Sequence, residues 1–199
     1  IAVIRVPRIS NFTDFNPLEN IPGVSLRYVK HPSDLKDPDM ILLPGSKNTM
    51  GDLKWMRESG MEAAVQKQAS RGKVIFGICG GYQMLGETLN DPYSVEDGGS
   101  MKGMGLIPMD TVFTQNKTRT RAEGAFGNVA GDLSALSGVS FSGYEIHMGK
   151  SCLKEGAYPL THVSDTVSGK AKREGGGCKN VYGTYVHGIF DRELSLIHI

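Results

Sequence analysis

Short, continuous apolar runs alternate with polar and turn-forming segments along the first half of the chain. The runs are IAVIRV at 1–6, VSLRYV at 24–29, MILLP at 40–44 and VIFGI at 74–78. Continuous runs of this length are typical of strands that are buried on both faces, as in parallel sheets. The pattern therefore predicts a mostly parallel sheet in the first half of the chain.

A helical pattern separates the third run from the fourth. In DLKWMRESGMEAAVQKQASRG, apolar residues recur at roughly helical spacing, and Gly60 divides the segment into two pieces. An order of strand, helix and strand predicts an α/β fold with a doubly wound, mostly parallel sheet of the flavodoxin-like type. Ligands of such sheets bind beyond the carboxyl ends of the strands, so we expect the functional site there.

The second half is predicted to be richer in β-structure. Strand-like segments occupy 104–113, 139–149 and 180–190, and polar, glycine-containing segments at 90–102 and 168–180 are predicted as loops and turns. The basic cluster TRTR at 118–121 is predicted as a solvated loop, although contact with a phosphate or a partner's carboxylates is the alternative. A helix-like pattern begins near Asp191. We expect residues 1–199 to form a single domain.

Composition and charge exclude several classes of partner. The 199 residues carry 22 Lys and Arg against 21 Asp and Glu, so no strong field attracts nucleic acid or an anionic membrane. No apolar segment approaches the length needed to span a membrane. The three cysteines are far apart and odd in number, which argues against a disulfide framework and against a zinc site. We expect a cytoplasmic protein without a metal, a membrane or a nucleic acid as its partner.

The segment GICGGYQMLG at 77–86 places Cys79 between glycines, directly after a predicted strand and before a predicted helix. This arrangement is typical of a nucleophile elbow, a tight turn in which residues without a β-carbon are needed. The N-terminus of a helix also favours the anionic thiolate, which is the nucleophilic form of cysteine. The alternative is a small buried cysteine without chemistry.

Five histidines compete to act as the base for such a thiolate. His31, His162 and His198 lie in segments without supporting signals, whereas His187 ends a strand-like run and should project at the same sheet edge as Cys79. His147 remains a rival, because it shares one face of a predicted strand with Glu145. An oxyanion would need two backbone donors, for which Gly80 and the turn at Gly45 are candidates. An ordinary strand-ending turn is the alternative at Gly45.

Five ordered segments together resemble the class I glutamine amidotransferases, and among them the glutaminase domains of the cobyric acid synthase family. These segments are IRVPRISNFTDFNPL, LLPGSKNT, GICGGYQMLG, GYEIHMG and YGTYVHGIF, and the resemblance runs from Ile1 to about Asp191. It implies that Cys79 is the nucleophile and His187 the catalytic base. It also implies that the oxyanion and the substrate lie near Gly45, Ser46, Gly80 and Gln83, and that this domain needs no metal or organic cofactor.

One departure from the broader class concerns the third catalytic residue. Many class I glutaminases carry His-x-Glu, whereas here His187 is followed by Gly188, Ile189 and Phe190. The sequence analysis therefore predicts a Cys-His dyad. Glu145 and Asp191 are candidates for an orienting or a structural role, and His147 for a structural or substrate-neighbouring one.

The resemblance implies that the chain hydrolyses glutamine and passes ammonia to an ATP-dependent synthetase domain, which amidates carboxylates of cobyrinic acid diamide in cobalamin synthesis. We expect this chain to be the C-terminal part of a longer synthetase. It contains no G-x-x-x-x-G-K-[ST] motif, so ATP and Mg²⁺ are expected in the synthetase domain, which is absent here. Two alternatives are another cysteine hydrolase on the same fold, such as a peptidase or γ-glutamyl hydrolase, and a non-catalytic binding module.

Overall fold

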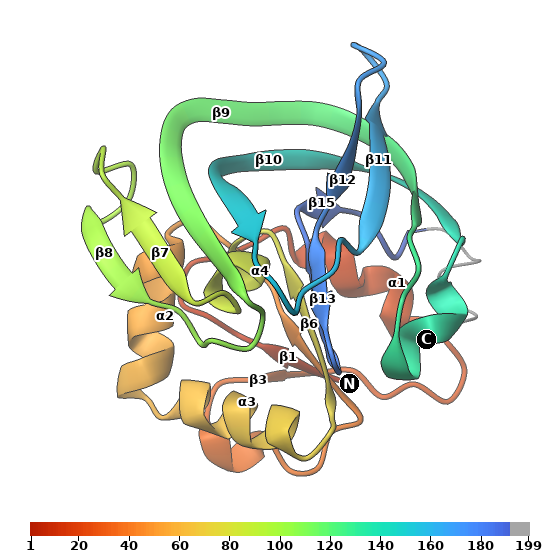
Figure 1. The fold of residues 1–199 in the computed structure, drawn as a ribbon. Coiled ribbons are helices and arrows are strands. Elements are labelled where there is room, and N and C mark those ends of the chain that lie inside the picture. The colour runs from red at the N-terminus through yellow and green to blue at the C-terminus, as the bar shows by residue number, and fades with distance from the viewer. Residues whose placement is uncertain (192–199) are drawn as a thin grey trace.

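A six-stranded sheet lies at the centre of the computed structural model, which describes residues 1–191 (Figure 1). Its order is β13-β14-β6-β4-β1-β3, and all neighbouring strands are parallel except β13 and β14. The strands are β1 (Ala2–Ile4), β3 (Arg27–Val29), β4 (Met40–Leu43), β6 (Val74–Ile78), β13 (Gly176–Cys178) and β14 (Val181–Thr184). Each of the four apolar runs supplies one parallel strand, which confirms the predicted mostly parallel α/β sheet.

The helices are short and connect the strands. They are α1 (Asn16–Glu19), α2 (Thr49–Glu58), α3 (Met61–Ser70) and α4 (Gly80–Met84), with 3₁₀ turns η1 (Phe12–Phe15), η2 (Pro32–Asp34) and η3 (Gly131–Leu136). The predicted break at Gly60 is confirmed, because this glycine has a φ of 79° between α2 and α3. The N-terminus of α2 is capped by Asn48, whose side-chain oxygen accepts a 2.6 Å hydrogen bond from the Gly51 N–H.

A second sheet, in the order β12-β11-β9-β10-β15, arches over the central one (Figure 1). Its long ribbon is formed by β9 (Met109–Phe126) and β10 (Ser140–Leu153), joined by β11 (Thr161–Asp165), β12 (Ala171–Glu174) and β15 (Val186–His187). The hairpin of β7 (Thr88–Asp91) and β8 (Gly99–Lys102) pairs with β9, and β2 (Ile9–Ser10) pairs with β5 (Gly45–Ser46) in a small separate ladder. The predicted enrichment of β-structure in the second half is thus confirmed.

The structure corrects three local predictions. TRTR at 118–121 is not a loop but part of β9, where Arg119 lies opposite Ile146 and Arg121 opposite Tyr144. The segments predicted as loops at 168–180 and 90–102 likewise contain β12, β13 and β8. The helix expected after Cys79 ends at Met84, and a strand follows. In each case pairing with a distant strand decides the structure, and a polar strand with one exposed face carries little local signal. The helix expected after Asp191, and His198, lie outside the described residues.

The carboxyl ends of the parallel strands converge on one edge of the central sheet. The segment after β1 continues into β2 and η1, the segment after β4 into β5, and the segment after β6 into α4, while β14 leads into β15. The strand order reverses at β1: β3 lies on one side of β1, and the later strand β4 lies on the other side. Such a switch point is where ligands of open α/β sheets bind.

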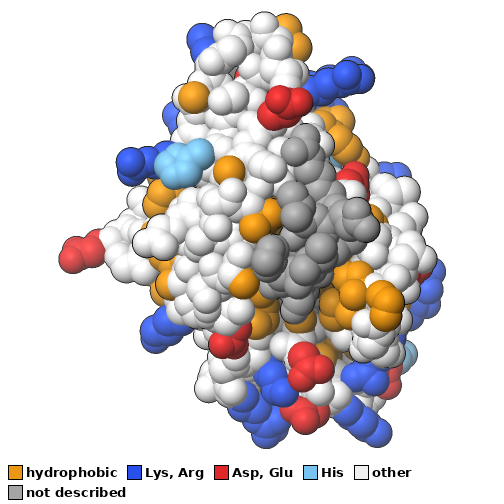
Figure 2. Space-filling view, turned by 90° about the vertical axis from the view of Figure 1, so that its right-hand side faces the viewer, with side chains coloured by type: hydrophobic (Ala, Val, Ile, Leu, Met, Phe, Trp, Pro, Cys, Tyr) orange, Lys and Arg blue, Asp and Glu red, His pale blue; other side chains and the backbone are white. Residues whose placement is uncertain are grey.

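Charged side chains of both signs intermingle on the surface. On the face shown in Figure 2, acidic and basic groups lie side by side along the lower edge, as expected from their near balance in the sequence. Among residues 1–191, no helix is long and apolar enough to cross a membrane.

Candidate active site

Cys79 occupies a strained turn between β6 and α4. Its φ of 52° and ψ of −108° lie in a region that side-chain-bearing residues rarely adopt. The turn is held on both sides, because the Cys79 N–H donates to the Thr184 carbonyl at 2.8 Å and the Gln83 N–H donates to the Cys79 carbonyl at 3.0 Å. The turn predicted for a nucleophile elbow is therefore present in the structure, and Cys79 as a whole is 7% exposed.

The glycines around Cys79 are required by close packing. A β-carbon on Gly77 would lie 2.6 Å from the Tyr82 nitrogen, and one on Gly81 would overlap the Leu43 carbonyl group. A β-carbon on Gly80 would lie 2.9 Å from the Ser46 nitrogen. Because none of these three glycines is among those with positive φ, lack of space rather than left-handed backbone explains them.

His187 lies beside this turn in a buried cage. Its ring is 1% exposed, stacks on Tyr144 with centroids 5.2 Å apart, and has Nδ1 2.8 Å from Asp14 Oδ2. The other oxygen of Asp14 accepts the Gly188 N–H at 3.0 Å. Burial alone would lower the pKa of His187, but hydrogen bonds to Asp14 and Cys79 outweigh it and raise this pKa to about 10. The imidazolium form is therefore favoured at neutral pH.

Asp14 corrects the predicted Cys-His dyad, because the described residues form a Cys-His-Asp arrangement. The two acidic residues considered from the sequence do not contact His187. Glu145 lies 2.6 Å from Lys172 Nζ and 3.5 Å from His147 Nε2, and Asp191 is exposed, with its N–H donating to the Gly188 carbonyl. A carboxylate on Nδ1 fixes the tautomer and orientation of the imidazole, as in other triads.

His147, the rival base, is occupied elsewhere. Its Nδ1 lies 2.7 Å from the Gly149 carbonyl oxygen, to which it donates a hydrogen bond. The ring stacks on Tyr185, with centroids 3.7 Å apart and an interplanar angle of 16°. His147 lines the catalytic cavity as a neighbour of the reacting groups, without an acidic partner on Nδ1.

The turn after β4 lies against the elbow, as the sequence analysis predicted. The Lys47 N–H donates to the Arg8 carbonyl at 2.9 Å, so these two residues form a hydrogen-bonded pair of the antiparallel ladder. Hydrogen-bonded and non-hydrogen-bonded pairs alternate in such a ladder, so the N–H groups of the next pair, Ser46 and Ile9, point away from the partner strand. The Ser46 amide therefore points away from β2, and a β-carbon on Gly80 would lie 2.9 Å from its nitrogen. Gly45 lies close to His187, because a β-carbon on Gly45 would be 3.2 Å from the His187 ring.

These groups surround a cavity of about 360 Å³, lined by residues that include Ser46, Cys79, Gln83, Lys117, Glu96 and His187. Gln83 is 3% exposed, and its amide is engaged by the protein: it accepts from Thr49 Oγ1 at 3.0 Å and donates to the Tyr185 hydroxyl at 3.2 Å. Gln83 therefore shapes the cavity floor through a fixed side chain.

Two opposite charges also border the cavity. Glu96 accepts the Met50 N–H at 2.8 Å, and burial raises the pKa of this carboxyl group. Lys117 approaches from β9. A carboxylate and an ammonium group on one cavity match the α-ammonium and α-carboxylate of a free amino acid.

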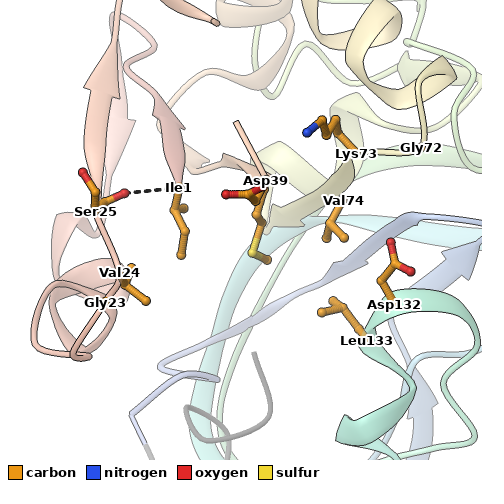
Figure 3. Close-up of a pocket in the computed structure, with 11 residues that line it drawn as sticks. Ile1, Gly23, Val24, Ser25, Asp39, Gly72, Lys73, Val74, Asp132 and Leu133 are labelled. Atoms are coloured by element: carbon orange, nitrogen blue, oxygen red, sulfur yellow. Dashed lines mark hydrogen bonds between the residues drawn. The ribbon is translucent and has the colours of Figure 1, made fainter. Parts of the chain in front are cut away.

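A separate cavity of about 480 Å³ lies at the opposite end of the central sheet (Figure 3). It is lined by Ile1, Met40 and Val74, which stand at the amino ends of β1, β4 and β6, and by Lys73 and Asp132. It contains no cysteine or histidine. Among residues 1–191, no group of three or more His, Cys, Asp or Glu side chains is placed to hold a metal ion.

Sequence reasoning missed Asp14 and Asn11, which lie together in SNFTDFNPL. The side-chain nitrogen of Asn11 lies 3.0 Å from Nδ1 and 3.2 Å from Nε2 of His187. An available signal was the position of this segment, since it follows the first strand and so emerges at the same sheet edge as Cys79. Any acidic residue in a segment that follows a parallel strand is therefore a candidate partner for His187, even when it lies far from the histidine in the sequence.

A strained cysteine elbow and a His-Asp pair at the carboxyl edge of a parallel sheet define a class: the chain has the fold of the class I glutamine amidotransferases. A glutamine amidotransferase crystal structure superposes with a TM-score of 0.70 at 16% identity, covering 99% of this chain and 95% of that one. PurLQS from Thermotoga maritima gives a TM-score of 0.67 at 23% identity, covering 94% and 85%.

Within this class, the chain belongs to the CobB/CobQ-like glutamine amidotransferase domain family, whose model matches residues 1–194. The cobyric acid synthase of Ruminiclostridium cellulolyticum is 56% identical over all of this chain and 39% of that protein. The cobyric acid synthase of Moorella thermoacetica is 47% identical over the same shares. The chain thus spans about 39% of the length of these relatives.

Proposed function

We propose that this chain is the glutamine-hydrolysing domain of a cobyric acid synthase, with Cys79 as nucleophile. The observation that carries the proposal is the strained Cys79 turn beside His187, whose Nδ1 is held by Asp14 at 2.8 Å. The matched charges of Glu96 and Lys117 on the same cavity favour free glutamine over a peptide, whose α-groups are not charged.

The reaction proceeds in two halves. The Cys79 thiolate attacks the carboxamide carbon of glutamine, and the backbone N–H groups of Ser46 and Gly80 stabilise the oxyanion. The His187 imidazolium donates its proton to the leaving nitrogen, so that ammonia departs and a glutamyl thioester remains. The thioester removes the charge on sulfur that raised the pKa of His187. The neutral imidazole then takes a proton from water, which attacks the thioester and releases glutamate.

The fate of the ammonia is also part of the proposal. Because this chain covers 39% of the Ruminiclostridium cellulolyticum relative, about 61% of that protein lies outside the match. In our proposal, that part binds ATP and Mg²⁺ and uses the ammonia to amidate carboxylates of cobyrinic acid diamide. This domain itself acts without a metal or an organic cofactor. A reducing, cytoplasmic setting suits it, since Cys79, Cys152 and Cys178 are unpaired.

The test measures glutamate and ammonia release by the full-length protein with Cys79→Ala alongside. The variant should lose glutamine hydrolysis and glutamine-dependent amidation but keep amidation from added ammonium salt, because only the nucleophile is removed. Retained hydrolysis would exclude Cys79 as nucleophile. Turnover of γ-glutamyl peptides in preference to free glutamine would instead favour a peptidase or γ-glutamyl hydrolase. A wild-type protein that turns over neither substrate would leave only a binding role.

A further inference from the structure

A fully buried carboxylate lies behind the turn that carries the oxyanion donor. Asp52, in α2, has no exposed surface. Its Oδ2 accepts a 2.6 Å hydrogen bond from Ser46 Oγ, and both of its oxygens lie 3.2 Å from the Arg8 N–H nitrogen. The Arg8 guanidinium adds a contact at 3.3 Å. Asp52 therefore joins Ser46 of β5, and Arg8 directly before β2, to helix α2.

The hydroxyl of Ser46 is fixed from both sides. It donates to Asp52 and accepts the Asn48 N–H at 3.0 Å. Asn48 is in turn the cap of α2, where it receives the Gly51 N–H. With its side chain held by a donor and an acceptor, Ser46 has little freedom to rotate its backbone. Its amide is thereby held in the outward direction, on the side of Gly80 and the catalytic cavity.

Burying the charged Asp52 carboxylate costs free energy. Burial raises the pKa of Asp52, and its hydrogen bonds to Ser46 and Arg8 offset only part of this effect. An apolar side chain of similar volume would avoid the penalty, but it would lack the directional contacts that orient Ser46. Asp52 does not line the catalytic cavity, so its influence on substrate must pass through Ser46.

We propose that Asp52 is a positioning residue for the oxyanion site: its hydrogen bond to Ser46 Oγ holds the Ser46 N–H toward the substrate carbonyl oxygen on Cys79. The half-exposed Arg8 supports the carboxylate from the surface side. This inference rests on the proposed glutaminase function, because it assigns a role in forming the tetrahedral intermediate.

The experiment uses the full-length protein and compares Asp52→Asn, Ser46→Ala and the double variant. Removing one oxyanion donor lowers kcat by about 10²–10³-fold, so misaligning it should lower kcat by about 10–100-fold with KM changed less than about threefold. Both substitutions act on the same contact, which Asp52→Asn weakens by removing the charge and one acceptor oxygen and Ser46→Ala removes altogether. The double variant should therefore be no slower than the slower single variant. If the two losses of kcat multiply in the double variant, the proposal is overturned.

A second readout separates alignment from general disruption. Alkylation of Cys79 by iodoacetamide displaces iodide at a saturated carbon and forms no oxyanion, so its rate should change less than about twofold in Asp52→Asn. An alkylation rate that falls in parallel with kcat would overturn the proposal. If Asp52→Asn does not fold, Arg8→Gln tests the same link from the exposed side, with an expected loss of kcat of about threefold to tenfold and the same unchanged alkylation rate.

The matched control lies in the same helix. Arg57→Gln, in the last turn of α2, breaks a 2.7 Å ion pair with Glu62, and it should lower the thermal midpoint while leaving kcat unchanged. A fall in kcat for Arg57→Gln equal to that for Asp52→Asn would show that any disturbance of α2 suffices, and would overturn the proposal. Absence of glutamine hydrolysis by the wild-type protein is a different result, which refutes the proposed function itself.

Discussion

At the scale of single residues, the proposed chemistry depends on the contacts of His187 with Asp14 and Cys79. The His187 ring is buried and hydrogen-bonded to a carboxylate, and the thiol adds to the rise in its pKa to about 10. This raised pKa keeps the His187 imidazolium protonated at neutral pH, so the acid that the proposed reaction needs for ammonia departure is present before substrate binds. Two predictions follow from these contacts.

Asp14→Asn should lower kcat for glutamine hydrolysis by about 100-fold or more, because the amide can present its nitrogen to Nδ1 and hold the wrong tautomer. Asp191→Asn is the matched control and should change kcat by less than about twofold, since Asp191 is exposed and its backbone, not its side chain, bonds to Gly188. Steady-state kinetics of both variants in the full-length protein provide the measurement. If both variants lose kcat equally, Asp14 is not the residue that orients His187.

His187 should also make stability depend on pH. Its pKa is raised in the folded state from 6.5 to about 10, so its contribution is fully present below about pH 6.5 and is lost as pH rises toward 10. The difference in unfolding free energy between wild type and His187→Gln should therefore shrink across this window, by up to about 1 kcal/mol per pH unit. Urea titrations at pH 6, 8 and 10 measure it. A difference that is constant or grows with pH contradicts the prediction.

At the scale of elements, α4 is seated directly on the sheet. Gly81 lies so close to β4 that a β-carbon on it would overlap the Leu43 carbonyl. A β-carbon on Gly77 of β6 would likewise lie 2.6 Å from the Tyr82 nitrogen in α4. The same closeness brings Gly80 to Ser46, the other predicted oxyanion donor. The packing of one short helix therefore sets both the Cys79 turn and the distance between Gly80 and Ser46.

Gly81→Ala should destabilise the protein by about 3 kcal/mol or more, because backbone atoms of β4 or α4 must move to admit the methyl group. Gly72→Ala is the control: this glycine has a φ of 84° but nothing within 4 Å of its β-carbon position, so only backbone strain of about 1 kcal/mol is expected. Urea denaturation followed by circular dichroism compares the two. A smaller loss for Gly81→Ala than for Gly72→Ala would disprove the close seating of α4.

At the scale of the whole molecule, one buried carboxylate connects the two sheets. Glu174 in β12 accepts hydrogen bonds from the Thr161 and Thr184 hydroxyls at 2.8 Å and 2.6 Å, and from the Tyr185 N–H at 2.6 Å. Thr161 belongs to the second sheet, whereas Thr184 ends β14 of the central one. Burial raises the pKa of Glu174, and the three donors partly compensate for that effect.

Glu174→Ala should lower the unfolding free energy by about 2–4 kcal/mol, because it leaves the buried Thr184 hydroxyl and Tyr185 N–H without an acceptor, whereas the Thr161 hydroxyl keeps the backbone carbonyl of residue 174 at 3.1 Å. Glu123→Ala, on the exposed side of β9 in the same sheet, is the control and should stay within about 0.5 kcal/mol of wild type. Thermal and urea unfolding of both variants measure the effect. An equal, small change in both would mean that other contacts hold the two sheets together.

The sequence by itself determined those features that depend on neighbouring residues. The parallel strands, the break at Gly60 and the Cys79 turn all follow from apolar runs and glycine positions, and His187 was correctly placed at the same sheet edge because it ends a strand. The strands formed by TRTR and by 171–174 were not predicted, since their pairing partners lie elsewhere in the chain.

Only the tertiary structure decided which distant groups meet. Asp14 is 173 residues from His187, and Asp52 meets Arg8 across 44 residues. No periodicity or local motif encodes such contacts, because they are set by the order of strands in the sheet, which brings the segments after β1, β4, β6 and β14 to one edge. The Cys79 turn is thus a local property of the chain, whereas the contacts of His187 with Asp14 and of Ser46 with Asp52 are properties of the fold.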